Sequence, residues 1–133
     1  LLLVSAGDVT DQQPTLTVRE STAAQEAFAM MDDNDIRAIT VVDGDGKPLG
    51  FVKRREARGA QGDCAGLLHP FRITGKAEDN LRVVLSKLYE SNTSWMPIVD
   101  EAGRYNGEIS QDYIADYLSS GKTRRVLNIH SDA

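Results

Sequence analysis

The sequence contains little of what disulfide-stabilised, membrane-spanning or nucleic-acid-binding proteins need. Its one cysteine, Cys64, cannot form an internal disulfide, so a reducing cytoplasm fits the chain. The longest purely apolar run, Leu1–Val4, is far shorter than the roughly 20 residues of a membrane span. The chain has fewer positive than negative charges, with 15 Lys and Arg residues and 20 Asp and Glu residues. The resulting net charge of −5 argues against a nucleic-acid partner.

The start of the chain also lacks the cationic flank and the length of a signal peptide. It begins without methionine and runs directly into Leu-Leu-Leu-Val, so we expect a fragment of a larger protein. With 133 residues, of which 41% are hydrophobic and 26% charged, the chain is long enough for a core. We expect one compact domain or two closely packed half-domains.

The chain contains an internal repeat at a constant offset of 57 residues. Residues 71–117 then align without a gap on residues 14–60, although only five aligned pairs are identical. Apolar positions coincide, since Ala24, Ala27, Phe28 and Met31 align with Leu81, Val84, Leu85 and Leu88. The turn glycines coincide too: Gly46 and Gly50 align with Gly103 and Gly107. A tandem repeat of this size predicts two supersecondary units that bury their open faces against each other, with function at the seam.

Each repeat predicts the same order of elements: strand, helix, strand, strand, helix. A short strand over 15–18 precedes a helix, which we expect to begin with a capping box of Thr22 and Gln25. We expect the corresponding helix of the second repeat to begin with Asp79 as its N-cap. The first helix is expected to end near residues 32–35, because acidic groups are unfavourable at a helix C-terminus. The predicted strands that follow are Ile39–Val42, Leu49–Lys53 and Tyr105–Ser110. The last helix is clear in the second repeat and weak in the first, and the tail has one candidate strand over 125–129.

This doubled order, with an Asp-x-x-Gly turn between the middle strands, resembles a tandem pair of cystathionine-β-synthase-type (CBS) repeats, or Bateman module. The phrases Ala38-Ile39-Thr40-Val41-Val42-Asp43 and Trp95-Met96-Pro97-Ile98-Val99-Asp100 resemble the family's central strand. The fold class implied is α/β (α+β), with two β-α-β-β-α repeats packed with pseudo-two-fold symmetry. We place repeat 1 at 8–61, a linker at 62–68, repeat 2 at 69–120 and a tail at 121–133.

The resemblance implies an adenosine-type ligand held between the repeats by a Gly-x-x-Ser/Thr-x-x-Asp phrase. Here that phrase departs from the pattern in both repeats. The first has Lys53 for the hydroxyl residue and Glu56 for the aspartate, and the second keeps Ser110 but has Tyr113 at the carboxylate position. A ribose contact is therefore in doubt at both sites. The candidate ligand-binding residues are Thr17, Arg37, Ile39, Lys53, Arg55, Glu56, Thr74, Trp95, Met96, Ser110 and Asp112.

Two of these candidates have an ordinary structural interpretation as well. The run Lys53-Arg54-Arg55 at a helix start is able to hold phosphate or another anion, but a solvated basic helix end is equally consistent. Trp95 is able to stack on a base, whereas a lone Trp is more often a core or interface anchor.

Catalytic and metal-binding patterns are weak. Cys64 and His69 have no third partner in the sequence, so a catalytic pair is not expected. Asp32, Asp33 and Asp35 fit a solvated acidic helix end better than a cation site. The sequence gives no catalytic residue and no metal ligand, and it requires no cofactor.

The phrasing Val9-Thr10-Asp11-Gln12-Gln13-Pro14 and the altered ribose phrase most resemble the C-terminal repeats of glycine betaine/proline/choline ABC transporter ATP-binding subunits. That resemblance implies a cytoplasmic regulatory module that senses ionic strength, an adenosine-type nucleotide or a cyclic dinucleotide. The implied partners are a second copy of the chain, the ATPase domain of the same chain, the transporter complex and the membrane surface reached through the host, with no nucleic acid. Two alternatives remain: an adenine-nucleotide sensor of another host (metabolic enzyme, kinase or channel), and a small stand-alone enzyme.

Overall fold

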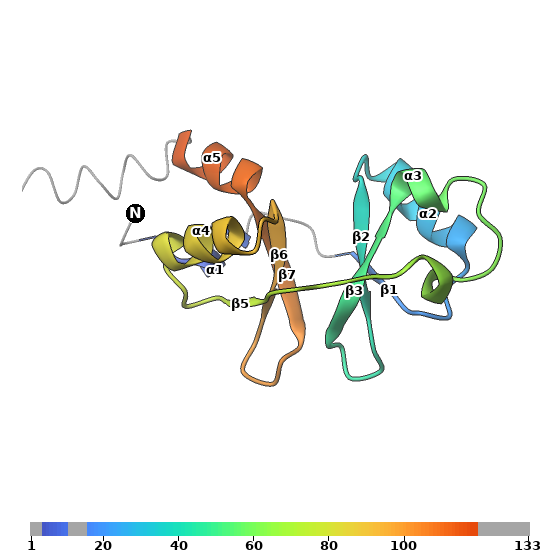
Figure 1. Cartoon of the computed structure of the whole chain (residues 1–133), viewed down its shortest axis with the longest axis horizontal. Helices are drawn as coiled ribbons and strands as arrows, with labels where there is room; N and C mark the ends of the chain where they lie inside the picture. The colour runs from blue at the N-terminus through green and yellow to red at the C-terminus, as the bar shows by residue number, and fades with distance from the viewer. Residues whose placement is uncertain (1–3, 11–15, 120–133) are drawn as a thin grey trace, which may run out of the picture. The chain divides into compact units, whose positions relative to one another are not determined.

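The computed structural model describes residues 4–10 and 16–119, and within them the chain forms two compact units (Figure 1). The first-repeat unit comprises residues 16–72 and 101–105. The second-repeat unit comprises residues 4–10, 73–100 and 106–119. The predicted tail, with its candidate strand over 125–129, lies outside the described residues.

The first-repeat unit is a small mixed sheet covered by helices. Its strand order is β1-β2-β3-β4, where β1 runs parallel to β2 and the other neighbours are antiparallel. Figure 1 shows α2 and α3 on one side of this sheet. The elements are β1 (Thr17–Val18), α2 (Ala24–Asp33), β2 (Ala38–Val42), β3 (Pro48–Lys53), α3 (Arg54–Ala57), a 3₁₀ helix (Cys64–Leu67) and β4 (His69–Pro70).

The core of this unit follows from the two periodicities of the sequence. Ala27 and Met31 lie on the buried face of α2, and alternate strand residues, including Ile39, Val41 and Val52, point toward them. Phe28 packs at the margin of this core and is only partly buried. The predicted apolar face of the first helix is therefore confirmed.

The second-repeat unit repeats this arrangement around a three-stranded sheet of order β5-β6-β7, with β5 parallel to β6. Its core contains Leu81, Val84 and Leu88 from the helix and Met96, Ile98 and Ile109 from the strands, while Leu85 packs at its margin. Figure 1 shows α1, α4 and α5 on one side of this sheet. The elements are α1 (Ala6–Thr10), β5 (Gly75–Lys76), α4 (Leu81–Glu90), β6 (Trp95–Val99), β7 (Tyr105–Ser110) and α5 (Gln111–Ser119).

The N-terminal segment with α1 belongs to the second-repeat unit, which the sequence did not predict. Val4, Ala6 and Val9 are buried in its core, and the Ala6 N–H donates to the Asp79 carbonyl at 2.7 Å. In the same part of the chain, the Leu81 N–H donates to the Val4 carbonyl at 3.2 Å. The start of the chain thus completes the fold of the second repeat, while the repeat boundaries at 8–61 and 69–120 stay a prediction.

Two details of the helix starts differ from the prediction. The capping box is wrong: Thr22 accepts from the Arg19 N–H instead, and Gln25 donates to the carbonyls of Ala57 and Ala60. Gln25 is therefore used to fix α3 and the turn after it against α2. In the second repeat the N-cap is Asn80, one residue after the predicted Asp79.

The aligned turn glycines are confirmed by the backbone. Gly46 and Gly103 have φ angles of 81° and 82°, a conformation that residues with a side chain rarely adopt. Gly50 has a different reason: a Cβ there would lie 2.2 Å from the His69 carbonyl oxygen, because β4 passes close to it. Within the described residues, no helix is long and apolar enough to cross a membrane.

Candidate functional site

In the first-repeat unit, one face of the sheet carries polar and aromatic side chains opposite the helix-covered core. Thr17 is the register partner of Thr40, and Thr40 is the partner of Phe51 on β3. Because Val18, Val41 and Val52 point into the core, their neighbours Thr17, Thr40 and Phe51 point to the other face. The Thr40 hydroxyl is buried and has no hydrogen-bond partner in the described part of the chain. We call this surface the helix-free face.

The residue at the family's carboxylate position, Glu56, is engaged within its own unit. Its Oε1 lies 2.5 Å from Nε2 of His69, and the His69 ring stacks on Phe51 with 5.3 Å between centroids. The hydrogen bond with His69 lowers the pKa of Glu56, so that this carboxyl group is ionised at neutral pH. Glu56 thus holds β4 against α3 rather than presenting an unoccupied carboxylate.

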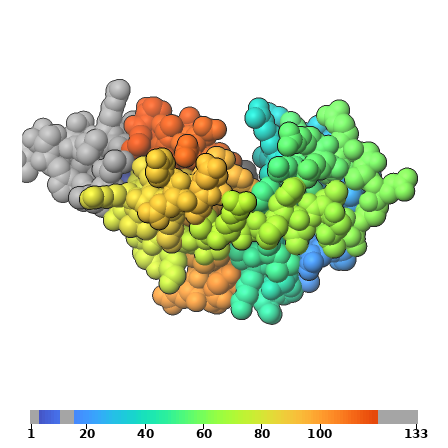
Figure 2. Space-filling model, viewed as in Figure 1, coloured from blue at the N-terminus to red at the C-terminus, as the bar shows by residue number. Residues whose placement is uncertain are grey.

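The basic segment after β3 lies at the surface. The helix it starts, α3, is a single turn of four residues, and it lies in the green part of Figure 2. Arg54 is paired with the acidic end of α2, since its Nη1 lies 3.6 Å from Oδ1 of Asp35. The neighbouring Arg37 and Arg55 are exposed, and Lys53 is half-buried. These cations are accessible to an anionic ligand.

In the second-repeat unit, residues of the corresponding Gly-x-x-Ser/Thr-x-x-Asp phrase also form hydrogen bonds within their own unit. The Ser110 hydroxyl accepts from the Tyr113 N–H at 3.0 Å and so caps the start of α5. The Tyr113 hydroxyl donates to Oε1 of Glu108 at 3.4 Å. Glu108 alternates with the core residue Ile109, so it points to the helix-free face of its own sheet. The Glu108–Tyr113 pair was not predicted, although the alternation along β7 places a carboxylate on that face.

Burial raises the pKa of Glu108 from its ordinary value of 4.5 to about 7, with the Tyr113 hydrogen bond acting in the opposite direction. The folded protein therefore holds this proton to a higher pH than the unfolded chain does. It follows that the free energy of unfolding falls as the pH rises from about 4.5 to about 7, and then levels off.

We expect Glu108→Gln to remove this component of the pH dependence. The wild-type chain should lose at most about 3 kcal/mol relative to the variant across that range, and less where water screens the charge. Urea unfolding of both proteins at several pH values between about 5 and 8 measures the difference. Parallel curves for the two proteins would show that Glu108 titrates normally.

The candidate residues fall into three groups in the structure. Ile39 and Met96 are fully buried in the cores of their units. Thr17, Lys53, Trp95 and Ser110 are partly buried on the strands and alternate with core residues. The exposed candidates are Arg37, Arg55, Glu56, Thr74 and Asp112. The ligand-binding role of all these residues stays a prediction.

The described residues contain no group of three or more His, Cys, Asp or Glu side chains placed to hold a metal ion. Cys64 is buried, and burial raises the pKa of its thiol, which keeps it in its unreactive protonated form. Cys64 is thus part of the core of the first-repeat unit and is not placed to act as a nucleophile.

The comparisons with known proteins agree with the repeat architecture. The CBS domain family profile matches residues 6–63 and 73–120. The chain is 81% identical, over all of its 133 residues, to the osmoprotectant import ATP-binding protein OsmV of Salmonella typhimurium, and it spans 35% of that protein's length.

Two solved structures have the same fold. The CBS domain pair of protein MJ0100, in complex with 5′-methylthioadenosine and S-adenosyl-L-methionine, matches with a TM-score of 0.74 at 21% identity, covering 90% of this chain and 98% of that one. CBSX2 in complex with AMP matches with a TM-score of 0.71 at 18% identity, covering 96% of this chain and 98% of that one.

Proposed function

Because this chain belongs to the CBS domain family, we propose that it is the regulatory CBS pair of an osmoprotectant importer's ATP-binding subunit. The observation that carries the proposal is the 81% identity to OsmV over every residue of the chain. The chain covers only 35% of that relative, so the ATPase domain and the transporter are proposed partners. The pair would act at the cytoplasmic face of the membrane and perform no chemistry itself.

The proposed regulatory ligand is a cyclic dinucleotide, or an adenosine-type nucleotide other than AMP and ATP, bound at the helix-free faces. Support comes from the two similar structures, whose CBS pairs hold AMP, 5′-methylthioadenosine or S-adenosyl-L-methionine. Further support comes from two cations accessible to phosphate, Lys53 at the end of β3 and Arg55 in α3. Such a ligand would favour one of two packings of the module and so change the activity of the attached ATPase.

Ionic strength is the second proposed input, and the charge distribution of the first-repeat unit supports it. Asp35, which pairs with Arg54, has an almost fully exposed side chain. The nearby Asp32 and Asp33 are exposed as well. A single exposed pair of this kind contributes at most about 1 kcal/mol, and salt screens it. Several such contacts, made to a second copy of the chain, to the host subunit or to the membrane surface, would together respond to the internal salt concentration.

We expect AMP and ATP to bind this chain weakly or not at all. Oε1 of Glu56 is already bound to His69, and in the second repeat Tyr113 stands where the family has a carboxylate, so the ribose hydroxyls have fewer acceptors at either site. Isothermal titration calorimetry on the 133-residue chain measures this. A low-micromolar dissociation constant for either nucleotide would contradict the expectation and favour an adenine-nucleotide sensor.

Substitution of the basic residues after β3 tests whether they hold an anionic ligand. If a cyclic dinucleotide binds in the same assay, Lys53→Ala combined with Arg55→Ala should abolish binding and leave the melting temperature nearly unchanged. Substitutions of surface residues away from the core typically change stability by less than about 0.5 kcal/mol. Arg82→Ala, at an exposed position on α4, controls for the loss of a positive charge.

A further inference from the structure

The strand β7 carries an asparagine followed directly by a glycine, and this is the one Asn-Gly pair in the sequence. Asn106 is the second residue of the strand and is exposed, whereas Gly107 is buried. β7 is the last strand in the order β5-β6-β7, so among the described residues it forms an edge of its sheet. The pair therefore lies near the hairpin turn, on a strand at the margin of the second-repeat unit.

The reactivity of an asparagine depends on the backbone nitrogen that follows it. That nitrogen can attack Cγ of the side-chain amide and close a five-membered ring. A side chain on the following residue hinders the attack, and glycine has none. Glycine also leaves the peptide group more freedom to rotate. The φ angle of Gly107 is 127°, so the backbone already departs from regular strand geometry at this residue.

Two of the other asparagines are tethered through their side chains. Nδ2 of Asn34 donates to the Met30 carbonyl at 2.8 Å. Oδ1 of Asn80 accepts from the Val83 N–H at 2.9 Å and so caps α4. Each bond restricts the rotation of a side-chain amide, which must turn toward the next backbone nitrogen before it can react. Neither residue is followed by glycine.

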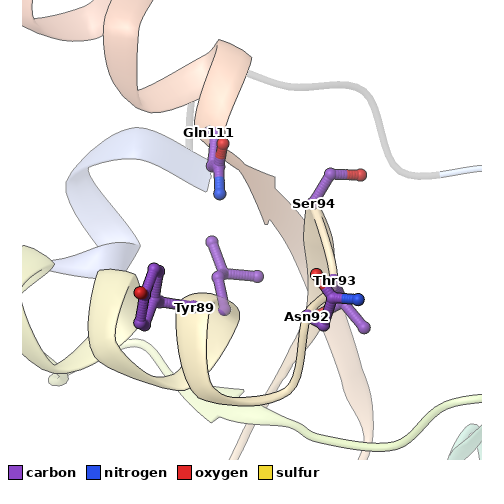
Figure 3. Close-up of a pocket in the computed structure, with 6 residues that line it drawn as sticks. Tyr89, Asn92, Thr93, Ser94 and Gln111 are labelled. Atoms are coloured by element: carbon purple, nitrogen blue, oxygen red, sulfur yellow. The ribbon is translucent and has the colours of Figure 1, made fainter.

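Asn92 and Asn106 are both exposed, and they differ in the residue that follows. Asn92 lies in the turn after α4 and precedes the β-branched Thr93, which crowds the backbone nitrogen between them (Figure 3). Asn106 precedes Gly107, and its side chain has no hydrogen-bond partner among the described residues. Within this part of the chain, Asn106 alone combines an untethered side chain with an unhindered neighbour.

We propose that Asn106 is a site of spontaneous deamidation. The backbone nitrogen of Gly107 loses its proton and bonds to Cγ of Asn106, and the side-chain nitrogen leaves as ammonia. Water then opens the resulting succinimide ring. Cleavage of the bond between the ring nitrogen and Cγ gives aspartate, and cleavage of the bond between the ring nitrogen and the main-chain carbonyl carbon gives isoaspartate.

The fold determines how readily the two atoms meet. An extended backbone keeps Cγ and the following nitrogen apart, so β7 must open locally before the ring closes. Local opening costs least at strand ends and sheet edges, where few contacts hold the backbone. Asn106 meets both conditions, because it lies one residue after the start of an edge strand. Its exposure also lets water reach the ring and ammonia leave.

Either product would change the face of the sheet that carries Glu108. Burial alternates along β7, so Asn106 and Glu108 lie on the same face, opposite the buried Gly107 and Ile109. A new carboxylate at position 106 would repel that of Glu108 and raise the pKa of Glu108 further. Isoaspartate also adds a carbon atom to the backbone of β7, which would disturb its pairing with β6. The reaction needs no ligand or partner, so its test is independent of the proposed function.

Peptide mapping of the 133-residue chain tests the proposal. After incubation at mildly alkaline pH, trypsin releases residues 105–122, a peptide whose one asparagine is Asn106. This peptide should lose its amide and gain an oxygen from heavy-oxygen water, faster as the pH rises, because the attacking nitrogen must lose its proton. The separate peptides that contain Asn34, Asn80 and Asn92 should stay largely unchanged. A sample digested without incubation corrects for conversion during the digest.

The same incubation in guanidinium chloride separates the effect of the fold from local chemistry. The peptides that contain Asn34 and Asn80 should convert faster there than in the folded chain, because their tethers are lost. Asn106→Gln, whose longer side chain closes the ring far less readily, should stop the conversion of the 105–122 peptide. If Asn106 keeps its amide in the folded chain and loses it readily in denaturant, β7 protects it and the proposal is overturned. Similar rates for all four asparagines in the folded chain would overturn it equally.

Discussion

Leu81→Ala is expected to lower the free energy of unfolding by about 2–5 kcal/mol. Leu81 is fully buried at the start of α4, where it packs in one cluster with Val84, Met96 and the N-terminal residue Val4. Truncation removes apolar contacts and leaves a cavity between the helix and the sheet, which close packing does not readily fill. Urea unfolding followed by circular dichroism measures the loss.

Val83→Ala is the matched control, because Val83 lies on the same helix with 40% of its surface exposed. Its truncation removes little buried area and introduces the better helix former, so the free energy of unfolding should change by less than about 0.5 kcal/mol. Equal losses for the two variants would mean that the assigned core face of α4, and with it the alignment of the repeats, is wrong.

The sequence allowed the repeat and the order of its elements to be predicted because both depend on local periodicity. The apolar positions of α2 and α4 recur at helical spacing, and the strands β2 and β6 are runs of mostly apolar residues. The turn glycines Gly46 and Gly103 mark the same hairpin in both repeats, and both have positive φ. The resemblance to the CBS family was confirmed by the family profile over both repeats.

Features that depend on contacts distant in sequence could not be predicted in this way. The short α1 packs against a repeat that begins more than sixty residues later, and nothing in its own five residues indicates that partner. Gln25 looked like part of a local capping box, but its amide bonds to the backbone about 30 residues away. The engagement of Glu56 by His69 likewise depends on β4 pairing with β3.

Under the proposed function, removal of this module from the proposed full-length ATP-binding subunit is expected to abolish the response of the importer to internal salt. ATP hydrolysis should continue, because the proposed ATPase domain belongs to the part of the subunit that these residues, 35% of the relative's length, do not cover. The response should be lost because exposed contacts such as Arg54–Asp35 are screened as the Debye length falls from about 10 Å at 0.1 M to about 3 Å at 1 M. A subunit without the module lacks these contacts.

Uptake of osmoprotectant into membrane vesicles, measured over a range of internal salt with and without residues 1–133, tests this account most directly. The account predicts an activation curve for the intact transporter and a flat, salt-independent rate for the truncated one, with ATP hydrolysis retained. An activation curve that is unchanged by the truncation would contradict it and remove the module from salt sensing.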